Sequence, residues 1–354
     1  MKKIKPRTCQ RMKLSNAVIA ILSVAAGFAL SHFVFPPAVP SEIPHCVKKL
    51  LKTHKLLQRC KPGARELNFL EKGGEYLPDY ENPRTLNDKI AYIVKNYYHK
   101  SPIARQLGNK YLTKEYVTQA VGKEYVVKLI GAWDNPSDIK WDDLPNRFVL
   151  KAVRGCSGKQ VIVVKDKSKI DIAATIKQLE EFCKRVGMEY VKSNRIIAEE
   201  YLEPSDGIEA IIDYKFFCSY GQVLFAQCMD ANSRDMHGKS CSYYSIPDWK
   251  RLPFTVSNCK PNILPRPKLF DRMIALAEKL SKSFPLIRVD LYEVGDRVLV
   301  GELTDDSGGA KGIISPLIWD FKLGEMINVP PLEELNKIIE NDKKKYGEEG
   351  IGQW

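Results

Sequence analysis

The chain has 354 residues, of which 44% are hydrophobic and 28% are charged. A chain of this length and composition can bury a sizeable core, which excludes a disordered protein and predicts one or two folded domains. The formal charge of +12 would suggest a nucleic-acid partner, but its distribution argues against one. Residues 1–13 hold six basic residues and no acid, residues 36–61 hold six basic residues and one acid, and the rest of the chain is nearly neutral. We therefore expect no nucleic-acid partner.

The segment between these two basic clusters, residues 14–35, contains no Asp, Glu, Lys or Arg. At about 1.5 Å per residue, a helix of this length can cross a hydrocarbon core of about 30 Å. The basic residues before it favour a cytosolic amino terminus and therefore a lumenal or extracytosolic body. A cleaved signal peptide is the alternative, but the apolar stretch is longer than an ordinary signal sequence requires. We predict a single-pass membrane protein with a basic tail (1–13), a transmembrane helix (14–35) and a linker or stem (36–75).

Nine cysteines are present, and eight of them follow the apolar segment. An even number on the far side of a membrane permits disulfides without requiring them. No Cys-x-x-Cys pair and no Cys/His cluster has the spacing of a zinc site, so no structural zinc is predicted.

The folded body is predicted to begin near residue 76, with helices that start at Thr85 and Asn109. Residues 147–153 and 160–165 read as two strands joined by a loop of small residues, and such a loop can approach a phosphate closely. Taken alone, this hairpin is more often structural, and it matches neither a Walker loop nor a dinucleotide-binding glycine motif. Further elements are expected in the order helix 171–186, strand 195–203, strands 213–220 and 222–227, and helix 268–283. Two α+β layers follow from this order.

A final hairpin, residues 287–304, carries charged side chains at alternating positions. Period-two alternation places Val298, Val300, Glu302 and Thr304 on one face of its second strand, and Asp290 lies in the middle of its first strand. A buried carboxylate is costly unless it is paired or bound to a cation, so the pattern indicates a site for a divalent metal and an anion. An exposed face with cross-strand ion pairs is an equally good interpretation.

The register of this hairpin follows from what a shared metal requires. A two-residue turn at Gly295-Asp296 would place Asp290 opposite Gly301 and turn Glu302 away. A Mg²⁺ ion shared by both carboxylates needs Asp290 opposite Glu302, and therefore Arg288 opposite Thr304. We predict this second register, with a three-residue loop closed by a bulge.

Five motifs in order, "FVLKAVRGCSG", "IIAEEYL", "DYKFFCSYG", "RVDLY" and "GELT", are similar to those of the TupA-like ATP-grasp family. This family is associated with cell-surface polysaccharide and teichuronopeptide biosynthesis. The resemblance covers roughly residues 109–324 and implies an α+β ATP-grasp fold, with two subdomains that clasp Mg-ATP. It also implies the reaction that is common among such enzymes, the ligation of a carboxylate to an amine through an acyl phosphate. The corresponding domains are an N-terminal part of the body (76–140), subdomain 1 with a phosphate flap (141–205), subdomain 2 with a metal site (206–330), and a C-terminal helix and tail (331–354).

The resemblance also assigns roles to individual residues. Arg288 would steady the developing anion, and Lys215 would face the nucleotide. The predicted ATP-binding residues are Lys110, Lys151, Gly155, Ser157, Gly158, Glu199, Glu200 and Tyr201. The resemblance places the last three at the hinge that holds adenine and ribose. The predicted Mg²⁺ ligands are Asp290, Glu302 and Thr304.

The sequence departs from the family pattern in three places. Asn109 stands where the family usually has Asp, and Thr304 stands where many ATP-grasp enzymes place a metal-binding Asn. Residues 304–309 replace a more apolar, proline-containing acceptor loop.

Functions of three classes follow from these observations. The first is a membrane-anchored, Mg-ATP-dependent ligase that acts on a cell-surface or secretory glycan or an attached peptide. The second is a type II membrane glycosyltransferase or a glycan-modifying kinase, because a basic tail, an anchor and a stem are their usual layout. The third is a catalytically silent binding protein. The paired lysines and the double-glutamate hinge favour ATP, whereas a sugar-nucleotide fold would need a parallel βαβ half that the sequence does not show.

Overall fold

A computed structural model describes residues 76, 79–155, 161–185, 194–204, 211–230, 241–257, 259–261, 263–305 and 307–348, which all belong to one unit, Ala64–Trp354. The predicted tail, transmembrane helix and stem, residues 1–75, lie outside this part, as do Ser157 and Gly158 of the predicted flap. None of the helices in the described ranges combines the length and the apolar character needed to cross a membrane.

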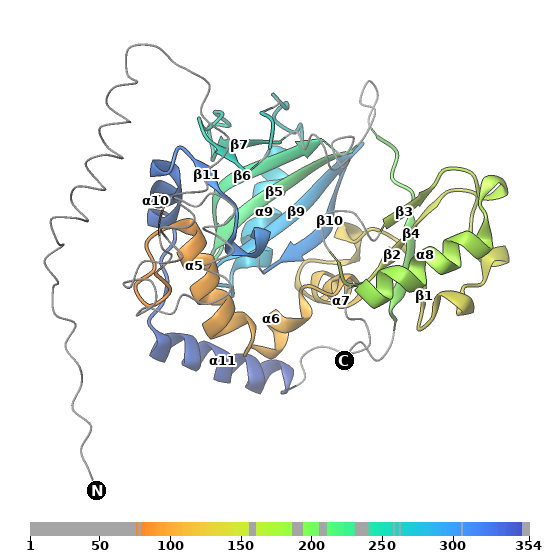
Figure 1. Ribbon diagram of the computed structural model, residues 1–354, viewed down its shortest axis with the longest axis horizontal. Helices are drawn as coiled ribbons and strands as arrows, with labels where there is room; N and C mark the ends of the chain where they lie inside the picture. The colour runs from red at the N-terminus through yellow and green to blue at the C-terminus, as the bar shows by residue number, and fades with distance from the viewer. Residues whose placement is uncertain are drawn as a thin grey trace, which may run out of the picture. The chain divides into compact units, whose positions relative to one another are not determined.

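The larger sheet has five antiparallel strands in the order β10-β9-β5-β6-β7 (Figure 1). Helix α9 (Phe270–Ser281) packs on one face of this sheet, because its apolar stripe, which includes Met273 and Leu280, is fully buried against the central strands. The opposite face, called the charged face below, carries Asp213, Lys215, Arg288, Asp290 and Glu302. The strands are β5 (Ile212–Ser219), β6 (Gln222–Asp230), β7 (Cys241–Ser245), β9 (Ile287–Val294) and β10 (Arg297–Thr304).

The smaller sheet has four antiparallel strands in the order β1-β4-β2-β3. They are β1 (Leu129–Trp133), β2 (Phe148–Ala152), β3 (Val161–Val164) and β4 (Ile196–Glu200). Helix α8 (Ile172–Arg185) packs against this sheet through Leu179, which is fully buried. The predicted hairpin around Lys151 is confirmed, since β2 and β3 pair directly. Strand β1 also joins this sheet by pairing with β4, so the sheet begins before the predicted boundary at residue 141.

The remaining helices surround the larger sheet or connect the two sheets. Helix α5 begins with a capping box in which the Thr85 hydroxyl and the Asp88 carboxylate bond to each other's backbone N–H, as the sequence predicted for a start at Thr85. The α-helices are α5 (Leu86–Ile93), α6 (Pro102–Gln106), α7 (Lys110–Ala120), α10 (Ile318–Glu325) and α11 (Leu332–Tyr346). The shorter elements are the π-helix η1 (Val94–Tyr98), the 3-10 helices η2 (Lys123–Tyr125), η3 (Pro136–Asp138), η4 (Trp141–Asp143), η5 (Lys167–Lys169) and η8 (Ser307–Ala310), and the paired strands β8 (Thr255–Val256) and β11 (Ile314–Ser315).

The register of β9 and β10 is the one that a shared metal requires. Asp290 lies opposite Glu302, and Arg288 lies opposite Thr304, so the predicted pairing is confirmed. These four side chains therefore belong to the same face of the hairpin.

The three-residue loop that was predicted to produce this register is wrong. Val294 pairs with Arg297 across a two-residue turn, in which Gly295 adopts a φ of +62° that suits glycine. The additional residue is Gly301 instead, where the pairing shifts by one position within β10. A Cβ on Gly301 would lie 2.5 Å from the ring of Tyr292, so a larger residue there would require the ring to move.

The prediction that Val298 and Val300 share a face with Glu302 and Thr304 is wrong, because of the same bulge. Strict alternation placed Val298 and Val300 on one face with Glu302 and Thr304, but the extra residue at Gly301 reverses the alternation. The two valines are therefore buried on the opposite face from the two polar residues.

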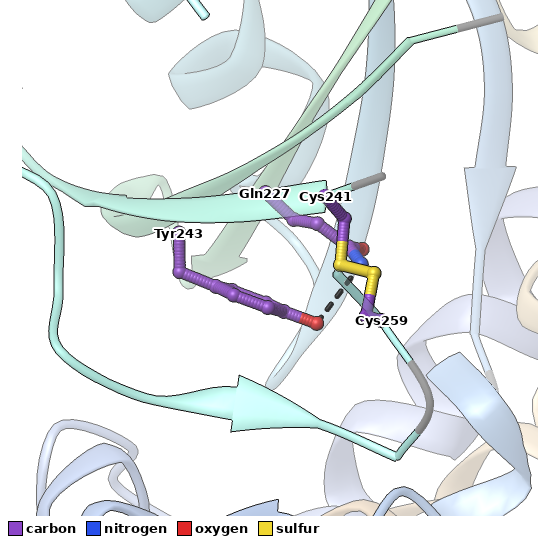
Figure 2. The surroundings of a disulfide bond; sticks show 4 residues. All are labelled: Gln227, Cys241, Tyr243 and Cys259. Carbon is purple, nitrogen blue, oxygen red and sulfur yellow. Dashed lines mark hydrogen bonds between the residues drawn. A yellow bond between two sulfur atoms is a disulfide. The ribbon is translucent and has the colours of Figure 1, made fainter. Parts of the chain in front are cut away.

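One disulfide joins Cys241, the first residue of β7, to Cys259, with 5.8 Å between their Cα atoms (Figure 2). Three other cysteines in the described ranges, Cys183, Cys218 and Cys228, are buried free thiols.

Candidate functional site

Asp290 is the most enclosed carboxylate of the charged face, with 2% of its side chain exposed. Arg288 donates a hydrogen bond to each of its oxygens, from Nε to Oδ1 at 2.7 Å and from Nη2 to Oδ2 at 2.8 Å. Lys215 lies opposite Asp290 on β5 and donates a third hydrogen bond to Oδ2 at 2.5 Å. Burial alone would raise the pKa of Asp290, but the two cations outweigh burial and lower the pKa. The carboxylate is therefore held in its ionised form.

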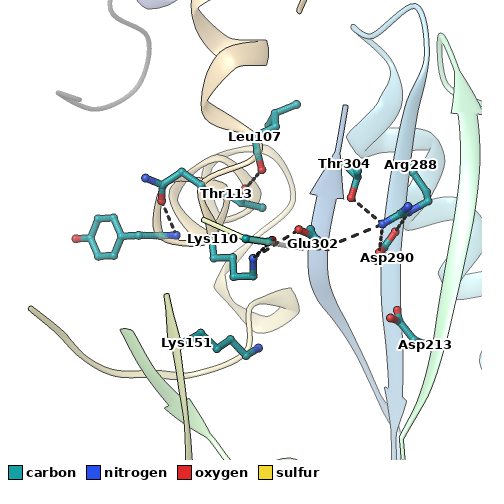
Figure 3. Close-up of polar contacts among 12 residues, drawn as sticks. Leu107, Lys110, Thr113, Lys151, Asp213, Arg288, Asp290, Glu302 and Thr304 are labelled. Atoms are coloured by element: carbon teal, nitrogen blue, oxygen red, sulfur yellow. Dashed lines mark hydrogen bonds and ion pairs between the residues drawn. The ribbon is translucent and has the colours of Figure 1, made fainter. Parts of the chain in front are cut away.

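The Arg288 guanidinium is fixed by four partners. Its Nη1 donates to Ser307 Oγ at 3.0 Å, and its Nη2 donates to Thr304 Oγ1 at 2.9 Å. The same Nη2 lies 3.9 Å from Glu302 Oε2 (Figure 3). Burial would lower the pKa of Arg288, but the carboxylates beside it raise the pKa, so the positive charge is permanent. Thr304, predicted as a metal ligand, accepts a hydrogen bond from this guanidinium.

Lys110 reaches Glu302 from the first turn of helix α7 (Figure 3). Its Nζ lies 3.6 Å from Glu302 Oε1 and donates to the Gly155 carbonyl at 3.2 Å. Two local contacts fix this position. Asn109 caps the helix through Oδ1, and the Lys110 N–H donates to the Val153 carbonyl at 2.8 Å. Asparagine is a good N-cap, so the departure from the family's usual Asp leaves the helix start intact.

Glu199 of β4 is clamped between two lysines. The Lys114 Nζ lies 2.6 Å from Glu199 Oε1, and Lys151 forms an ion pair with Oε2. Glu199 is only 4% exposed. Burial alone would raise its pKa, but the two ammonium groups outweigh burial and lower the pKa to about 2. The carboxylate that was predicted to hold the nucleoside is thus occupied in positioning Lys151.

The other two predicted hinge residues have other partners. Glu200 points away from Glu199, because neighbouring residues of a strand point to opposite faces, and Tyr201 follows the end of β4. Glu200 Oε1 accepts from the Lys128 N–H at 3.2 Å and from Arg297 Nη1 at 3.3 Å, which links the smaller sheet to β10. The ring of Tyr201 lies 4.2 Å below the guanidinium of Arg147.

Three further residues of this site had not been assigned roles from the sequence. Ser307 and Lys114 have the contacts described above, and no local pattern marks either of them. Asp213 could have been found, because it lies two residues before Lys215 and therefore on the same face of β5. Its Oδ2 accepts from Lys215 at 2.5 Å, whereas its Oδ1 is buried without a hydrogen-bond partner. Burial raises the pKa of Asp213, and Lys215 offsets this only in part.

The donor set fits a Mg²⁺ ion that is shared with phosphate. Within the described ranges, no three His, Cys, Asp or Glu side chains converge as ligands, so no closed protein cage is found there. Mg²⁺ usually binds through one or two carboxylates together with substrate phosphates and water, which is what Asp290 and Glu302 offer. A carboxylate has about four acceptor positions, so the three hydrogen bonds to Asp290 leave one for a metal.

A cavity of about 530 Å³ lies apart from these residues. It is lined by Tyr244 and Trp249, which stack on each other, and Trp249 in turn contacts Phe270 of α9. Tyr243 of β7 pairs with Gln227, which pairs with Lys215, so Tyr243 lies on the charged face. Tyr244 is the next residue and therefore lies on the opposite face, where α9 packs.

Two antiparallel sheets, with Lys151 on the smaller one, Lys110 on helix α7 and the carboxylates Asp290 and Glu302 on the larger one, define the class of the protein as ATP-grasp. Within this class, the model of the family described as TupA-like ATPgrasp matches residues 88–328, and the chain belongs to that family. A search of curated protein sequences found no match.

Solved structures with a similar fold include a D-alanine-D-alanine ligase from Helicobacter pylori, at 18% identity and a TM-score of 0.36 over 70% of each chain. A biotin carboxylase from Campylobacter jejuni has 16% identity and a TM-score of 0.36, covering 67% of this chain and 47% of that one. An N5-carboxyaminoimidazole synthetase from Staphylococcus aureus has 14% identity and a TM-score of 0.34, covering 57% and 45%. This chain thus spans less than half the length of the last two, and likenesses with TM-scores of 0.34 to 0.36 support no conclusion about this chain.

Proposed function

We propose that the protein is a Mg²⁺-ATP-dependent ligase that joins a carboxylate to an amine through an acyl phosphate. The observation that carries this proposal is the opposed pair Asp290 and Glu302, with the Arg288 guanidinium between them and Lys110 at their edge. Membership of an ATP-grasp family supports ATP as the nucleotide.

The chain's own residues divide the work of phosphoryl transfer. Lys110 and Lys151 would hold phosphate oxygens, and Asp290 with Glu302 would hold Mg²⁺. When bound, the ion would neutralise charge on the phosphates. Arg288 is fixed before any substrate arrives, so it can stabilise the negative charge that develops on the transferred group without reorganising.

The glycosyltransferase alternative has no support in the part of the chain that the structure describes. Every strand pair of the two large sheets is antiparallel. A sugar-nucleotide fold would require parallel βαβ units.

The acceptor and the location are part of the same proposal. We propose a glycan or an attached peptide as acceptor, presented at a membrane in which residues 14–35 anchor the protein, with the body on the extracytosolic side. The Cys241–Cys259 disulfide supports this side, because disulfides form and persist in oxidising compartments. The proposal requires ATP in that compartment.

Nucleotide binding tests the proposal first. In a calorimetric titration of the full chain in detergent, we expect ATP to bind in the presence of Mg²⁺. We expect Lys151→Ala to weaken binding about tenfold or more, because a charge-assisted contact to phosphate is lost. Lys337→Ala, which removes a surface lysine of α11, is the control and should bind as the wild type does. Equal affinity of Lys151→Ala and the wild type would remove Lys151 from the site.

The products then separate the candidate reactions. With glucuronate or glutamate as the carboxylate and alanine as the amine, a ligase releases ADP and inorganic phosphate and forms an amide. A kinase releases ADP and leaves phosphate on the acceptor. A silent binding protein forms no ADP and no modified acceptor.

A further inference from the structure

The chain that flanks edge strand β7 carries a cluster of exposed cations. Residues 247–268 contain five basic residues and one acidic residue, whereas the chain after residue 61 is nearly neutral as a whole. The five basic side chains are all exposed: Lys250, Arg251, Lys260, Arg266 and Lys268. We call these five side chains, together with that of Ile263, the β7 edge surface.

Neighbouring carboxylates balance this charge only in part. Lys250 and Arg266 form exposed ion pairs with Asp248 and Asp271. Such exposed pairs are weak and are screened by salt. The surface therefore keeps a net positive charge.

Ile263 gives this basic surface an apolar centre. Its side chain is 80% exposed, more than that of any other large hydrophobic residue in the described ranges. It lines the cavity of about 530 Å³ together with Arg251 and Pro253, so apolar and cationic groups lie side by side there. One exposed isoleucine is ordinary on a protein surface, but one that lies beside a cavity and among cations has the pattern of an interfacial contact.

Contacts with β7 hold the two segments of this surface in place. The Leu264 N–H donates to Tyr244 Oη at 2.9 Å, and Arg251 pairs with the same tyrosine in an antiparallel bridge. The Cys241 N–H donates to the Lys260 carbonyl at 3.0 Å, next to the disulfide described above. The surface is thus formed before a partner arrives.

Prolines reduce the cost of taking this backbone out of water. Pro253, Pro261 and Pro265 are exposed, and a proline has no N–H to leave unpaired. The N–H of Leu264 already has a partner in Tyr244. An unpaired backbone group is costly where water is scarce, so this composition suits a contact at the level of lipid headgroups.

The combination of charge and apolar centre distinguishes between kinds of partner. A second copy of this chain is disfavoured, because a two-fold contact would bring the five cations of one copy against those of the other. A soluble polyanion would bind the cations but offers no apolar group to Ile263. An anionic membrane offers both, because its headgroups attract Lys and Arg, and an apolar side chain can enter the boundary between headgroups and acyl chains.

We propose that the β7 edge surface docks on an anionic membrane, with Ile263 at the level of the headgroups. This contact is separate from the anchor proposed for residues 14–35, and it holds the folded body itself against the bilayer. It does not depend on the ligase function.

Hydrogen exchange of the full chain in lipid nanodiscs tests this contact. Two disc compositions are compared, phosphatidylcholine alone and an equal mixture of phosphatidylcholine and phosphatidylglycerol. We expect the backbone amides of residues 259–268 to exchange about tenfold or more slowly in the anionic discs, since each basic residue near the surface contributes about fivefold. The amides of helix α11 should exchange equally in both.

Variants of exposed side chains, which leave the core intact, assign the effect to the surface. Ile263→Ser removes the apolar centre, and the double variant Arg251→Ser and Lys260→Ser removes two cations. Both should lose most of the slowing. Leu332→Ser, which changes another exposed apolar residue, here followed by two glutamates, is the matched control and should keep the slowing.

Equal exchange of residues 259–268 in the two kinds of disc would overturn the proposal. Slowing that survives in Ile263→Ser would also overturn it, because charge alone would then explain the contact and the surface would fit any polyanion. If the chain does not enter the discs, its sedimentation with vesicles of the same two compositions gives the same comparison, and equal sedimentation with both overturns the proposal. The experiment needs no nucleotide, so either result leaves the ATP titration to decide the proposed function.

Discussion

Glu199 illustrates how one buried carboxylate can hold two cations in place. Lys114 and Lys151 come from α7 and β2, and their ammonium groups would repel each other without the shared anion. This contact fixes the ammonium group of Lys151, which the proposed function assigns to phosphate binding. Glu199, which sequence similarity assigns to nucleoside binding, thus has a structural role in holding two lysines close together.

This arrangement predicts a pH-dependent contribution to stability. The pKa of Glu199 is about 2 in the folded chain, below its ordinary value of 4.5, so its contribution is present above about pH 4.5 and is lost as the pH falls towards 2. The shift corresponds to about 3 kcal/mol. We expect Glu199→Gln to lower the free energy of unfolding by about this amount at pH 7, and the difference from the wild type to shrink below pH 4.5.

Guanidinium unfolding of both chains at several pH values provides the measurement. Glu333→Gln, which removes one partner of an exposed i,i+4 pair with Lys337, is the control and should change the free energy by less than about 0.5 kcal/mol. A Glu199→Gln difference that is the same at pH 7 and at pH 3 would contradict the ion-pair account.

The β9–β10 hairpin shows how a single glycine aligns a site. The two-residue turn alone would place Asp290 opposite Gly301, and the bulge at Gly301 moves Glu302 into that position. The ring of Tyr292 lies over the backbone there and would overlap a Cβ at its present position.

The packing of Tyr292 on Gly301 gives a testable non-additivity. We expect Gly301→Ala to destabilise the protein by about 1–3 kcal/mol, because the new methyl group overlaps the ring. In the double variant with Tyr292→Ala, the loss should be smaller than the sum of the single losses. Thermal unfolding of the four chains measures the coupling. Gly108→Ala is the control, since nothing lies within 4 Å of its Cβ position. Strictly additive losses would show that the ring moves aside without cost.

The hairpin also shows where sequence patterns suffice and where they fail. The pairing of Asp290 with Glu302 could be predicted, because two mid-strand carboxylates that share a cation must lie opposite each other. The bulge could not be placed, because a ring packed over Gly301 is a tertiary contact that leaves no periodic signal. The same limit applies to Glu199, whose two lysines come from distant parts of the chain. Helix starts at Thr85 and Asn109 were predictable, since their caps depend on residues within three positions.

The Cys241–Cys259 disulfide joins edge strand β7 of the larger sheet to the segment that follows β8. Beyond the disulfide bond, the Cys241 N–H donates to the Lys260 carbonyl at 3.0 Å, and the Ser257 N–H donates to the Ile313 carbonyl at 2.7 Å. These contacts tie edge strand β7 to β8 and then to β11. The segment before β11 includes η8, where Ser307 accepts from Arg288. A covalent link at one edge of the sheet thus supports the segment whose Ser307 binds Arg288.

We expect the loss of this disulfide to destabilise the protein by about 3 kcal/mol, because the cysteines are 18 positions apart and the unfolded chain gains the conformational entropy of a loop of that length. The melting temperature of the full chain should fall when dithiothreitol is added. It should fall by a similar amount, without reductant, in the double variant Cys241→Ser and Cys259→Ser. Reductant should then have no further effect on the double variant, which makes that variant its own control, because the described free cysteines are buried thiols. A wild-type melting temperature that does not change on reduction, with both cysteines shown to be reduced by maleimide labelling, would contradict this role and would remove the support that the disulfide gives to an extracytosolic body.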